Sequence, residues 1–185
     1  MPRRNINRVA TSADHQASLT KAVEHRLRAL SGVNSPTPTV VQSMITELRE
    51  LLRTPRVAME IDNLSIEDLS LTLALFDEAR PEVRDLAVWE IVERPGVGGP
   101  LALAAAQHAV SDETRASALC AYFLSAHRAR ATSRAGLALR AAHQTAPGHF
   151  LTRLLTVAHS RGETDEIFKI IKQGVDASRA KYGIE

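Results

Sequence analysis

Cysteine is almost absent from this chain of 185 residues, since Cys120 is the only one. A single cysteine excludes an internal disulfide and leaves no cluster of cysteines for zinc. Its neighbours in the sequence, Leu119 and Ala121, are apolar. We therefore predict a buried structural thiol, and a reducing cytoplasm is the simplest location for the protein.

Long apolar runs are also missing. No segment approaches the ~18 apolar residues that cross a bilayer, so we expect no membrane partner. The arginines Arg3 and Arg4 are not followed by the apolar stretch of a secretory signal. Residues 1–13 are instead expected to form a flexible basic arm, followed by a single helical domain over residues 14–185.

Aromatic residues make up only 4% of the chain, whereas alanine and leucine are abundant. This composition favours helices, because Ala and Leu lose little on entering a helix while aromatic and β-branched residues build strands. Apolar residues recur at helical spacing, most clearly at Val41, Met44, Ile45, Leu48, Leu51 and Leu52. The sequence therefore predicts an all-α fold of about eight or nine helices, packed as antiparallel hairpins.

Two segments refine this organisation. Residues 95–100, Pro-Gly-Val-Gly-Gly-Pro, are predicted to form a linker that could subdivide the domain. In the C-terminal half, the spacing of Ala135, Leu139, Ala142 and Pro147 is similar to that in the second helix of a tetratricopeptide repeat. Any crossing helices need small residues at their contact, so an ordinary helical hairpin is the alternative. The broad apolar face of residues 40–52 permits either a homodimer or packing on the main core.

The residue types that carry catalysis or bind metals form no recognisable motif. None of the seven histidines has a second metal ligand at helical spacing on the same face: His15, His25, His108, His127, His143, His149 and His159. Cys120 and His127 lie two helical turns apart, about 10.5 Å along the axis, which is beyond proton-transfer reach. The glycines of residues 95–100 lack the Lys-Ser/Thr of a phosphate loop. We expect no catalytic residues, metal or cofactor.

Charge is distributed unevenly along the chain. The formal charge of +2 is the sum of +4 over residues 1–35, −6 over residues 36–110 and +4 over residues 111–185. Carboxylates gather around Pro81, and the candidates for a partner surface are Asp77, Glu78, Glu82 and Asp85. Arginines are interleaved with them, which is typical of a solvated, salt-bridged face. A surface for a basic protein partner is the alternative.

Two basic groups could contact the phosphates of nucleic acid. The first is in the N-terminal arm and the second surrounds a predicted helix–helix turn; their members are Arg3, Arg4, Arg8, Arg128, Arg130 and Arg134. Neither group includes stacking aromatics, and no helix-turn-helix signature is present. The acidic middle of the chain would also repel DNA.

A series of segments between residues 64 and 170 carries a family resemblance: Val83-Arg84-Asp85, residues 116–126, residues 137–142, Pro147-Gly148 and residues 151–155. Their order is similar to that in the helical C-terminal part of an uncharacterised actinobacterial family, a domain of unknown function. Members usually carry a Gly-Asp-Gly turn where this chain has Ala131-Thr132-Ser133, and an α/β half that this chain does not show. The resemblance implies a helical fold and a bacterial, phage or plasmid setting, without an activity.

The sequence thus favours a non-catalytic helical module that binds a protein partner, in a bacterial or in a phage or plasmid setting. The alternative is a DNA-associated accessory or regulatory protein that uses the basic arm. An enzyme whose site is assembled from residues distant in sequence also stays open.

Overall fold

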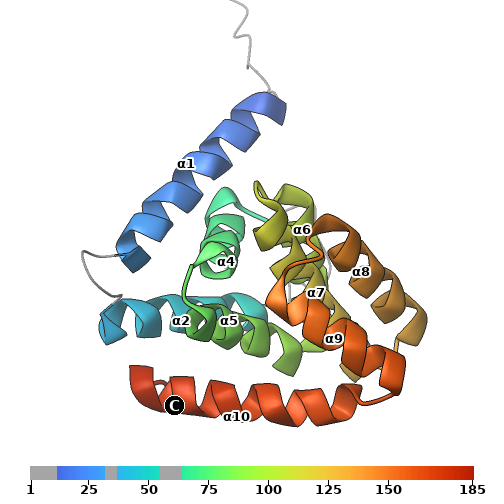
Figure 1. Ribbon diagram of the computed structural model, residues 1–185. Coiled ribbons are helices and arrows are strands. Elements are labelled where there is room, and N and C mark those ends of the chain that lie inside the picture. The colour runs from blue at the N-terminus through green and yellow to red at the C-terminus, as the bar shows by residue number, and fades with distance from the viewer. Residues whose placement is uncertain (1–11, 32–36, 55–63) are drawn as a thin grey trace, which may run out of the picture.

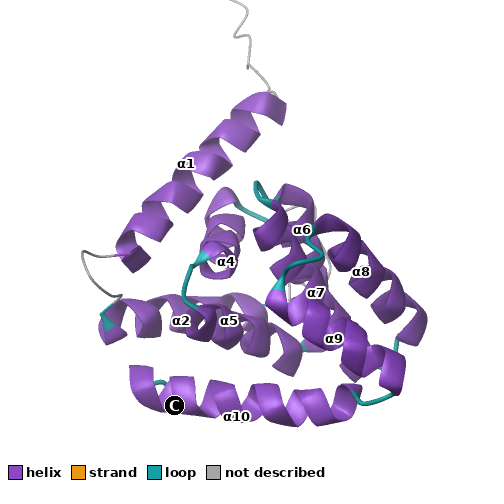
Figure 2. Cartoon of the chain, viewed as in Figure 1, coloured by secondary structure: helices purple, strands orange, loops and turns teal. Residues whose placement is uncertain are grey.

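The computed structural model describes residues 12–31, 37–54 and 64–185. In these ranges all regular structure is helical, and no strand occurs (Figures 1 and 2). The helices are α1 (Ser12–Ser31), α2 (Pro38–Arg53), α4 (Ile66–Asp77), α5 (Pro81–Glu93), α6 (Pro95–His108), α7 (Asp112–Arg128), α8 (Thr132–Thr145), α9 (Phe150–Arg161) and α10 (Thr164–Tyr182). The all-α prediction is confirmed, including the expected number of helices within the described ranges. Most of the expected arm, residues 1–11, lies outside them.

Several helices begin at residues that suit a helix N-terminus. The hydroxyl of Ser65 accepts a hydrogen bond from the backbone N–H of Asp68 at 3.1 Å, and Ser111 does the same for Thr114 at 3.1 Å. Pro81 occupies the first turn of α5, where its missing N–H costs nothing. These local hydrogen bonds stabilise the first turns of their helices without a tertiary contact.

Helix α7 lies at the centre of the packing. It contacts α4, α5, α6, α8 and α9, and α6 and α8 pack most extensively against it. Its buried side chains are mostly small, with Ala116, Ala118 and Ala121 fully buried, so neighbouring helices approach closely. Around this centre, α1 packs on α4, and α10 runs beneath α2 and α5 (Figure 1).

The apolar face of α2 is used inside the chain. Its six regularly spaced residues are all buried: Val41, Met44, Ile45, Leu48, Leu51 and Leu52. Helix α2 packs against α4, α5 and α10. Of the two alternatives for this face, packing on the main core explains it, and a homodimer through α2 is not supported.

The prediction of a linker at residues 95–100 is wrong. These residues form the first turns of α6, which follows α5 after the single residue Arg94. Gly98 is buried there, and a Cβ on it would lie only 2.2 Å from the carbonyl oxygen of Ile91. The glycine therefore lets the start of α6 approach the backbone at the end of α5, which is a packing requirement and no sign of a loop.

Gly98→Ala is expected to lower the free energy of unfolding by about 1–3 kcal/mol, because the added methyl group overpacks against a backbone carbonyl that cannot rotate away. Gly96→Ala, in the same turn, is the matched control. Beyond its chain neighbours and its own helix backbone, no atom lies within 4 Å of the added Cβ. The free energy of unfolding of Gly96→Ala should therefore rise by about 0.5–1 kcal/mol. Urea denaturation of both variants measures the difference. Equal effects at the two glycines would contradict the packing explanation.

Candidate functional site

Three of the four carboxylates proposed for a partner surface form hydrogen bonds or ion pairs within the chain. Glu78 is buried and pairs with Arg80 at 3.0 Å. Glu82 receives a hydrogen bond from Lys181 of α10 at 2.9 Å, and this bond lowers the pKa of Glu82. Asp77 accepts a hydrogen bond from the hydroxyl of Thr114.

Asp85 is the fourth of these carboxylates. Burial raises its pKa, against the opposing effect of Arg84. The other three thus contact α7, α10 and the turn between α4 and α5, and the four do not form one open acidic face. A protein-binding role for them stays a prediction without structural support.

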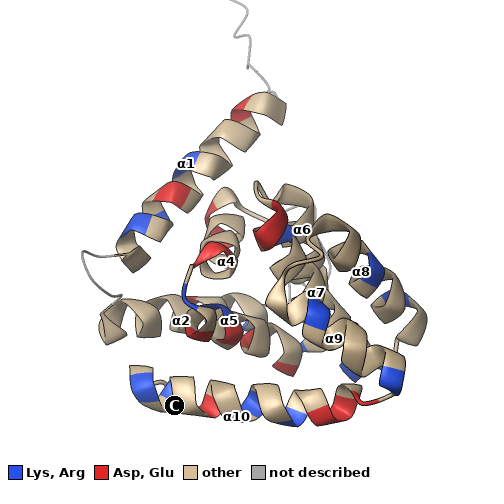
Figure 3. Ribbon diagram, in the orientation of Figure 1, with Lys and Arg blue, Asp and Glu red and all other residues tan. Residues whose placement is uncertain are grey.

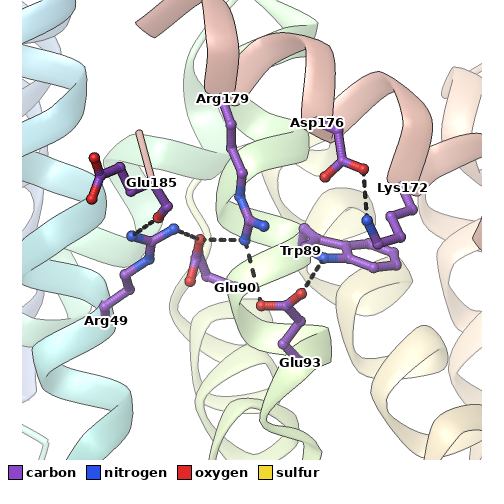
Figure 4. Close-up of polar contacts among 8 residues, drawn as sticks. All are labelled: Arg49, Trp89, Glu90, Glu93, Lys172, Asp176, Arg179 and Glu185. Atoms are coloured by element: carbon purple, nitrogen blue, oxygen red, sulfur yellow. Dashed lines mark hydrogen bonds and ion pairs between the residues drawn. The ribbon is translucent and has the colours of Figure 1, made fainter. Parts of the chain in front are cut away.

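A buried ion network fastens α10 to the body of the protein (Figure 4). The carboxylate of Glu90, only 1% exposed, lies between Arg49 of α2 at 2.8 Å and Arg179 of α10 at 2.9 Å. Burial alone would raise the pKa of Glu90, but the hydrogen bonds and charges of the two arginines outweigh it and the pKa is lowered. Arg49 also donates to the backbone carbonyl of Glu185 at 2.7 Å. Glu93 also lies 3.4 Å from Arg179, so two carboxylates balance the two arginines, and the network links α2, α5 and α10.

A second polar cluster is buried between α7 and α9. His149 accepts a hydrogen bond at Nδ1 from the backbone N–H of Thr152 at 3.2 Å, so it caps α9. Its Nε2 lies 3.0 Å from the hydroxyl of Ser117. The Thr152 hydroxyl lies 3.3 Å from the thiol of Cys120. The arrangement of a serine, a histidine and a hydroxyl superficially resembles a hydrolytic triad.

The hydrogen bonds of His149 do not fit a triad. Because Nδ1 accepts a backbone N–H, a neutral imidazole carries its proton on Nε2 and donates it to Ser117. A donor cannot take the proton of the serine hydroxyl. Ser117 and His149 are also buried, at 3% and 6% exposure. We conclude that this cluster holds α7 and α9 together.

Cys120 is the buried structural thiol that the sequence predicts. It is fully buried, and burial raises its pKa to about 12, against the opposing effect of the Thr152 hydrogen bond. The partner of His127 is Asp165 of α10 at 3.0 Å and not Cys120. Among the described residues, no group of three or more His, Cys, Asp or Glu side chains is placed to hold a metal. No helix in the described ranges is long and apolar enough to cross a membrane.

One surface combines strong charge with exposed apolar groups, and the sequence analysis missed it. Residues 114–162 contain no aspartate or glutamate but seven arginines. In Figure 3, α8 and α9 accordingly carry blue bands and no red. Six of these arginines are exposed, and their guanidinium groups form no hydrogen bond or ion pair with any described residue: Arg128, Arg130, Arg134, Arg140, Arg153 and Arg161.

A groove of about 450 Å³ lies between α8 and α9 on this surface. Gly136 and Leu139 line it from α8, while Thr156, His159 and Ser160 line it from α9. The same two helices carry six exposed side chains, of which Arg140 lines the groove: Leu137 and Arg140 on α8, and Phe150, Arg153, Val157 and Arg161 on α9. The four residues on α9 are spaced by three and four, so they form one stripe. We call the groove and these six side chains the hairpin face.

The two predicted nucleic-acid groups are placed unequally. Arg3, Arg4 and Arg8 lie outside the described residues. Arg128 and Arg130 lie at the turn between α7 and α8, and Arg134 is in the first turn of α8. All three of these C-terminal arginines are exposed, at one end of the hairpin face. The structure therefore joins the second basic group to a larger basic surface.

A family model, described as a domain of unknown function (DUF4192), matches residues 2–166. The match begins well before residue 64, so it covers more of the chain than the resemblance seen in the sequence. No curated protein matches the chain. No solved structure matches it either. Since the family model spans most of its length, the chain belongs to the DUF4192 family, whose function is unknown.

Proposed function

We propose that this protein is a non-catalytic module that binds a protein partner through the hairpin face. The observation that carries the proposal is the combination on one surface of unpaired arginines and exposed apolar side chains. Within the described residues, five large apolar side chains are exposed, and three of them lie on α8 and α9: Leu137, Phe150 and Val157. Their exposed fractions are 60%, 78% and 49%.

Single exposed apolar residues are ordinary on a monomer, but three of them on two adjacent helices that also form a groove favour an interaction site. Burying Phe150 and Val157 against a partner would remove apolar area from water, at about 25 cal/mol per Å². The surrounding arginines form no ion pair with a carboxylate of the described residues. A partner's carboxylates would therefore not have to displace an existing ion pair. Arginine and aromatic residues are also the types enriched at interface hot spots.

The partner that fits this surface is an acidic amphipathic helix. A helix laid along a groove presents apolar residues at spacings of three and four, which would meet Leu137 and Val157. Carboxylates on its flanks would meet Arg140, Arg153 and Arg161, and such charge complementarity raises the association rate and fixes orientation. The absence of acidic residues over residues 114–162 means that no like charge on this surface repels that partner.

The test is a fluorescence-anisotropy titration with a labelled 20-residue acidic amphipathic peptide, since about 20 residues form a helix of roughly 30 Å. Arg140→Glu with Arg153→Glu should weaken binding at least about tenfold, because two attractive contacts become repulsive. The matched control is Lys21→Glu with Arg28→Glu on α1, which changes the net charge equally at exposed positions away from the face. A scrambled peptide of the same composition tests the apolar spacing. Equal losses in both variants would contradict the hairpin face as the binding site.

Nucleic-acid binding is the second candidate, and the six unpaired arginines favour it. Labelled duplex DNA in the same assay distinguishes it. Phosphate contacts lose most of their affinity between about 50 and 200 mM salt, whereas apolar contacts with a peptide do not. Tight, steeply salt-dependent DNA binding together with no peptide binding would show that the partner is DNA and not a protein. The basic arm, with Arg3, Arg4 and Arg8, would then be expected to add to the affinity.

We place this activity in the cytoplasm of a bacterium, or in a phage or plasmid setting. The free thiol of Cys120 and the absence of a second cysteine support a reducing compartment. The choice of partner among cytoplasmic proteins depends on the charge of the hairpin face, which selects acidic helices.

A further inference from the structure

The turn between α7 and α8 forms one side of a pocket of about 570 Å³ that lies outside the groove of the hairpin face. Six residues line it: His127, Arg128, Arg130, Thr132, Asp165 and Phe168. They come from the end of α7, the turn, the start of α8 and the first turns of α10. Segments distant in sequence are therefore brought together around one cavity.

Arg130 holds an unfavourable backbone conformation in this turn. Its φ of 59° places it in the left-handed region, and it is the only described residue other than glycine with a positive φ. The turn is closed by hydrogen bonds from Ala131 N–H to the Ala126 carbonyl at 2.8 Å and from Arg130 N–H to the His127 carbonyl at 2.9 Å. Glycine is the residue that normally occupies this position after a helix, because a Cβ is strained there. An arginine at such a position costs stability without any internal contact of its guanidinium group to offset it.

The charges around the pocket are mostly positive. Arg128 and Arg130 have no hydrogen-bond or ion-pair partner for their guanidinium groups among the described residues. Asp165 is the single carboxylate in the lining, and it accepts a hydrogen bond from His127 at 3.0 Å. The nearby Glu166 is paired with Lys169 at 2.9 Å. The two acidic groups are thus engaged, while the two arginines are free.

Two rings, those of His127 and Phe168, form part of the pocket wall. The rings of His127 and Phe168 are stacked, with their centroids 5.6 Å apart and their planes inclined by 27°. Phe168 also makes an edge-to-face contact with Trp89, with ring centroids 6.2 Å apart. A planar group of a ligand could lie against this wall while an anionic group reaches the arginines.

We infer that this pocket binds the phosphate group of a small ligand through Arg128 and Arg130. Guanidinium groups match phosphate oxygens with two parallel hydrogen bonds, and phosphate carries more charge than a single carboxylate. Thr132 adds a hydroxyl, and the first turn of α8 contains no acidic residue to oppose an anion. The ring wall favours a phosphate ester with a planar group, such as a nucleoside monophosphate. This pocket adjoins one end of the hairpin face but shares no lining residue with its groove, and it does not depend on the protein-binding proposal.

Arg130→Gly makes the test sharp, because it removes the guanidinium group and relieves the backbone strain together. We expect this variant to fold with a melting temperature raised by about 2 °C, which is the shift expected from relieving one strained residue in a chain of this size. Its affinity for adenosine monophosphate and for inorganic phosphate, measured by isothermal titration calorimetry, should fall at least about tenfold. Arg128→Gln should cause a similar loss and leaves the turn unchanged.

Arg153→Gln is the control, since it removes an exposed arginine of the hairpin face outside the pocket. It should bind both probes as the wild type does. If the nucleotide binds more tightly than phosphate, the base contacts the ring wall. If the two bind equally, the ligand is free phosphate. Both results support the phosphate site. No saturable binding of either probe at millimolar concentrations, or unchanged binding in the Arg130 and Arg128 variants, would overturn it.

Discussion

Replacing Glu90 by leucine is expected to lower the free energy of unfolding by about 3 kcal/mol. Removing one partner of a buried ion pair typically costs 3–5 kcal/mol, because the remaining charge stays desolvated without compensation. Here Arg49 and Arg179 would face each other across the lost carboxylate. The loss should lie at the lower end of that range, since Arg49 keeps the Glu185 carbonyl and Arg179 keeps Glu93.

Guanidinium denaturation of two further variants separates a buried-charge effect from lost packing. Glu90→Leu combined with Arg49→Met and Arg179→Met should recover most of the stability, because apolar replacements of similar volume leave no buried charge without compensation. Glu93 loses Arg179 in this variant, but its side chain is 36% exposed and it keeps the hydrogen bond from Trp89. Glu50→Gln is the surface control, since its pair with Arg53 is largely exposed, and its effect should stay within about 0.5 kcal/mol. A triple variant that is less stable than Glu90→Leu would contradict the electrostatic explanation.

The same network predicts an acid-dependent loss of stability. Because the folded protein lowers the pKa of Glu90 below its ordinary value of 4.5, the stabilisation is complete above that value. It should disappear as the pH falls through the lower pKa of the folded state. Helix α10, whose residues make these contacts, should therefore be the first element to lose hydrogen-exchange protection in acid.

His149→Ala is expected to lower the free energy of unfolding by about 2–4 kcal/mol. The change removes the cap of α9, which is worth about 1 kcal/mol, and leaves the buried hydroxyl of Ser117 without its partner, which costs a further 1–3 kcal/mol. His143→Ala is the matched control, because His143 is exposed on α8 and makes no hydrogen bond with a described residue. Its effect should stay within about 0.5 kcal/mol.

The cost of His149→Ala should depend on pH. Burial lowers the pKa of His149, with Arg84 acting in the same direction and Glu113 opposing it. The unfolded chain therefore binds a proton below pH 6.5 that the folded protein excludes, and stability falls with decreasing pH by at most about 1.4 kcal/mol per pH unit. Urea unfolding at pH 7.5 and 5.5 should show a smaller difference between wild type and variant at the lower pH. A difference that grows in acid would show that the folded state favours the charged imidazole.

The helices could be predicted from the sequence because their signals are local. The apolar stripe of α2, from Val41 to Leu52, is visible in one short continuous segment of the sequence. The linker prediction for residues 95–100 failed because the role of Gly98 depends on Ile91 of the preceding helix. That contact exists only when α5 and α6 pack together. Composition alone then assigns a loop to residues that tertiary packing holds in a helix.

The hairpin face was missed for a different reason. The absence of acidic residues over residues 114–162 is visible in the sequence, but charges summed over the C-terminal third include Asp112, Glu113 and four acidic residues of 163–176. That sum hides how strongly basic the intervening stretch is. Which apolar residues of α8 and α9 stay exposed cannot be read from periodicity alone, because Leu137 and Leu139 differ only in the side of the helix they occupy. The carboxylates around Pro81 were favoured instead, and their long-range partners on α7 and α10 were not visible.

The most direct test of the account is to locate bound partner on the protein. Backbone amide chemical shifts can be followed while the unlabelled acidic amphipathic peptide is added to ¹⁵N-labelled protein. The account predicts that the perturbed amides lie in α8 and α9, around Leu137, Arg140, Arg153 and Val157. Perturbations confined to α4 and α5, around the carboxylates near Pro81, would contradict it, as would saturating peptide that shifts no amide of the hairpin face.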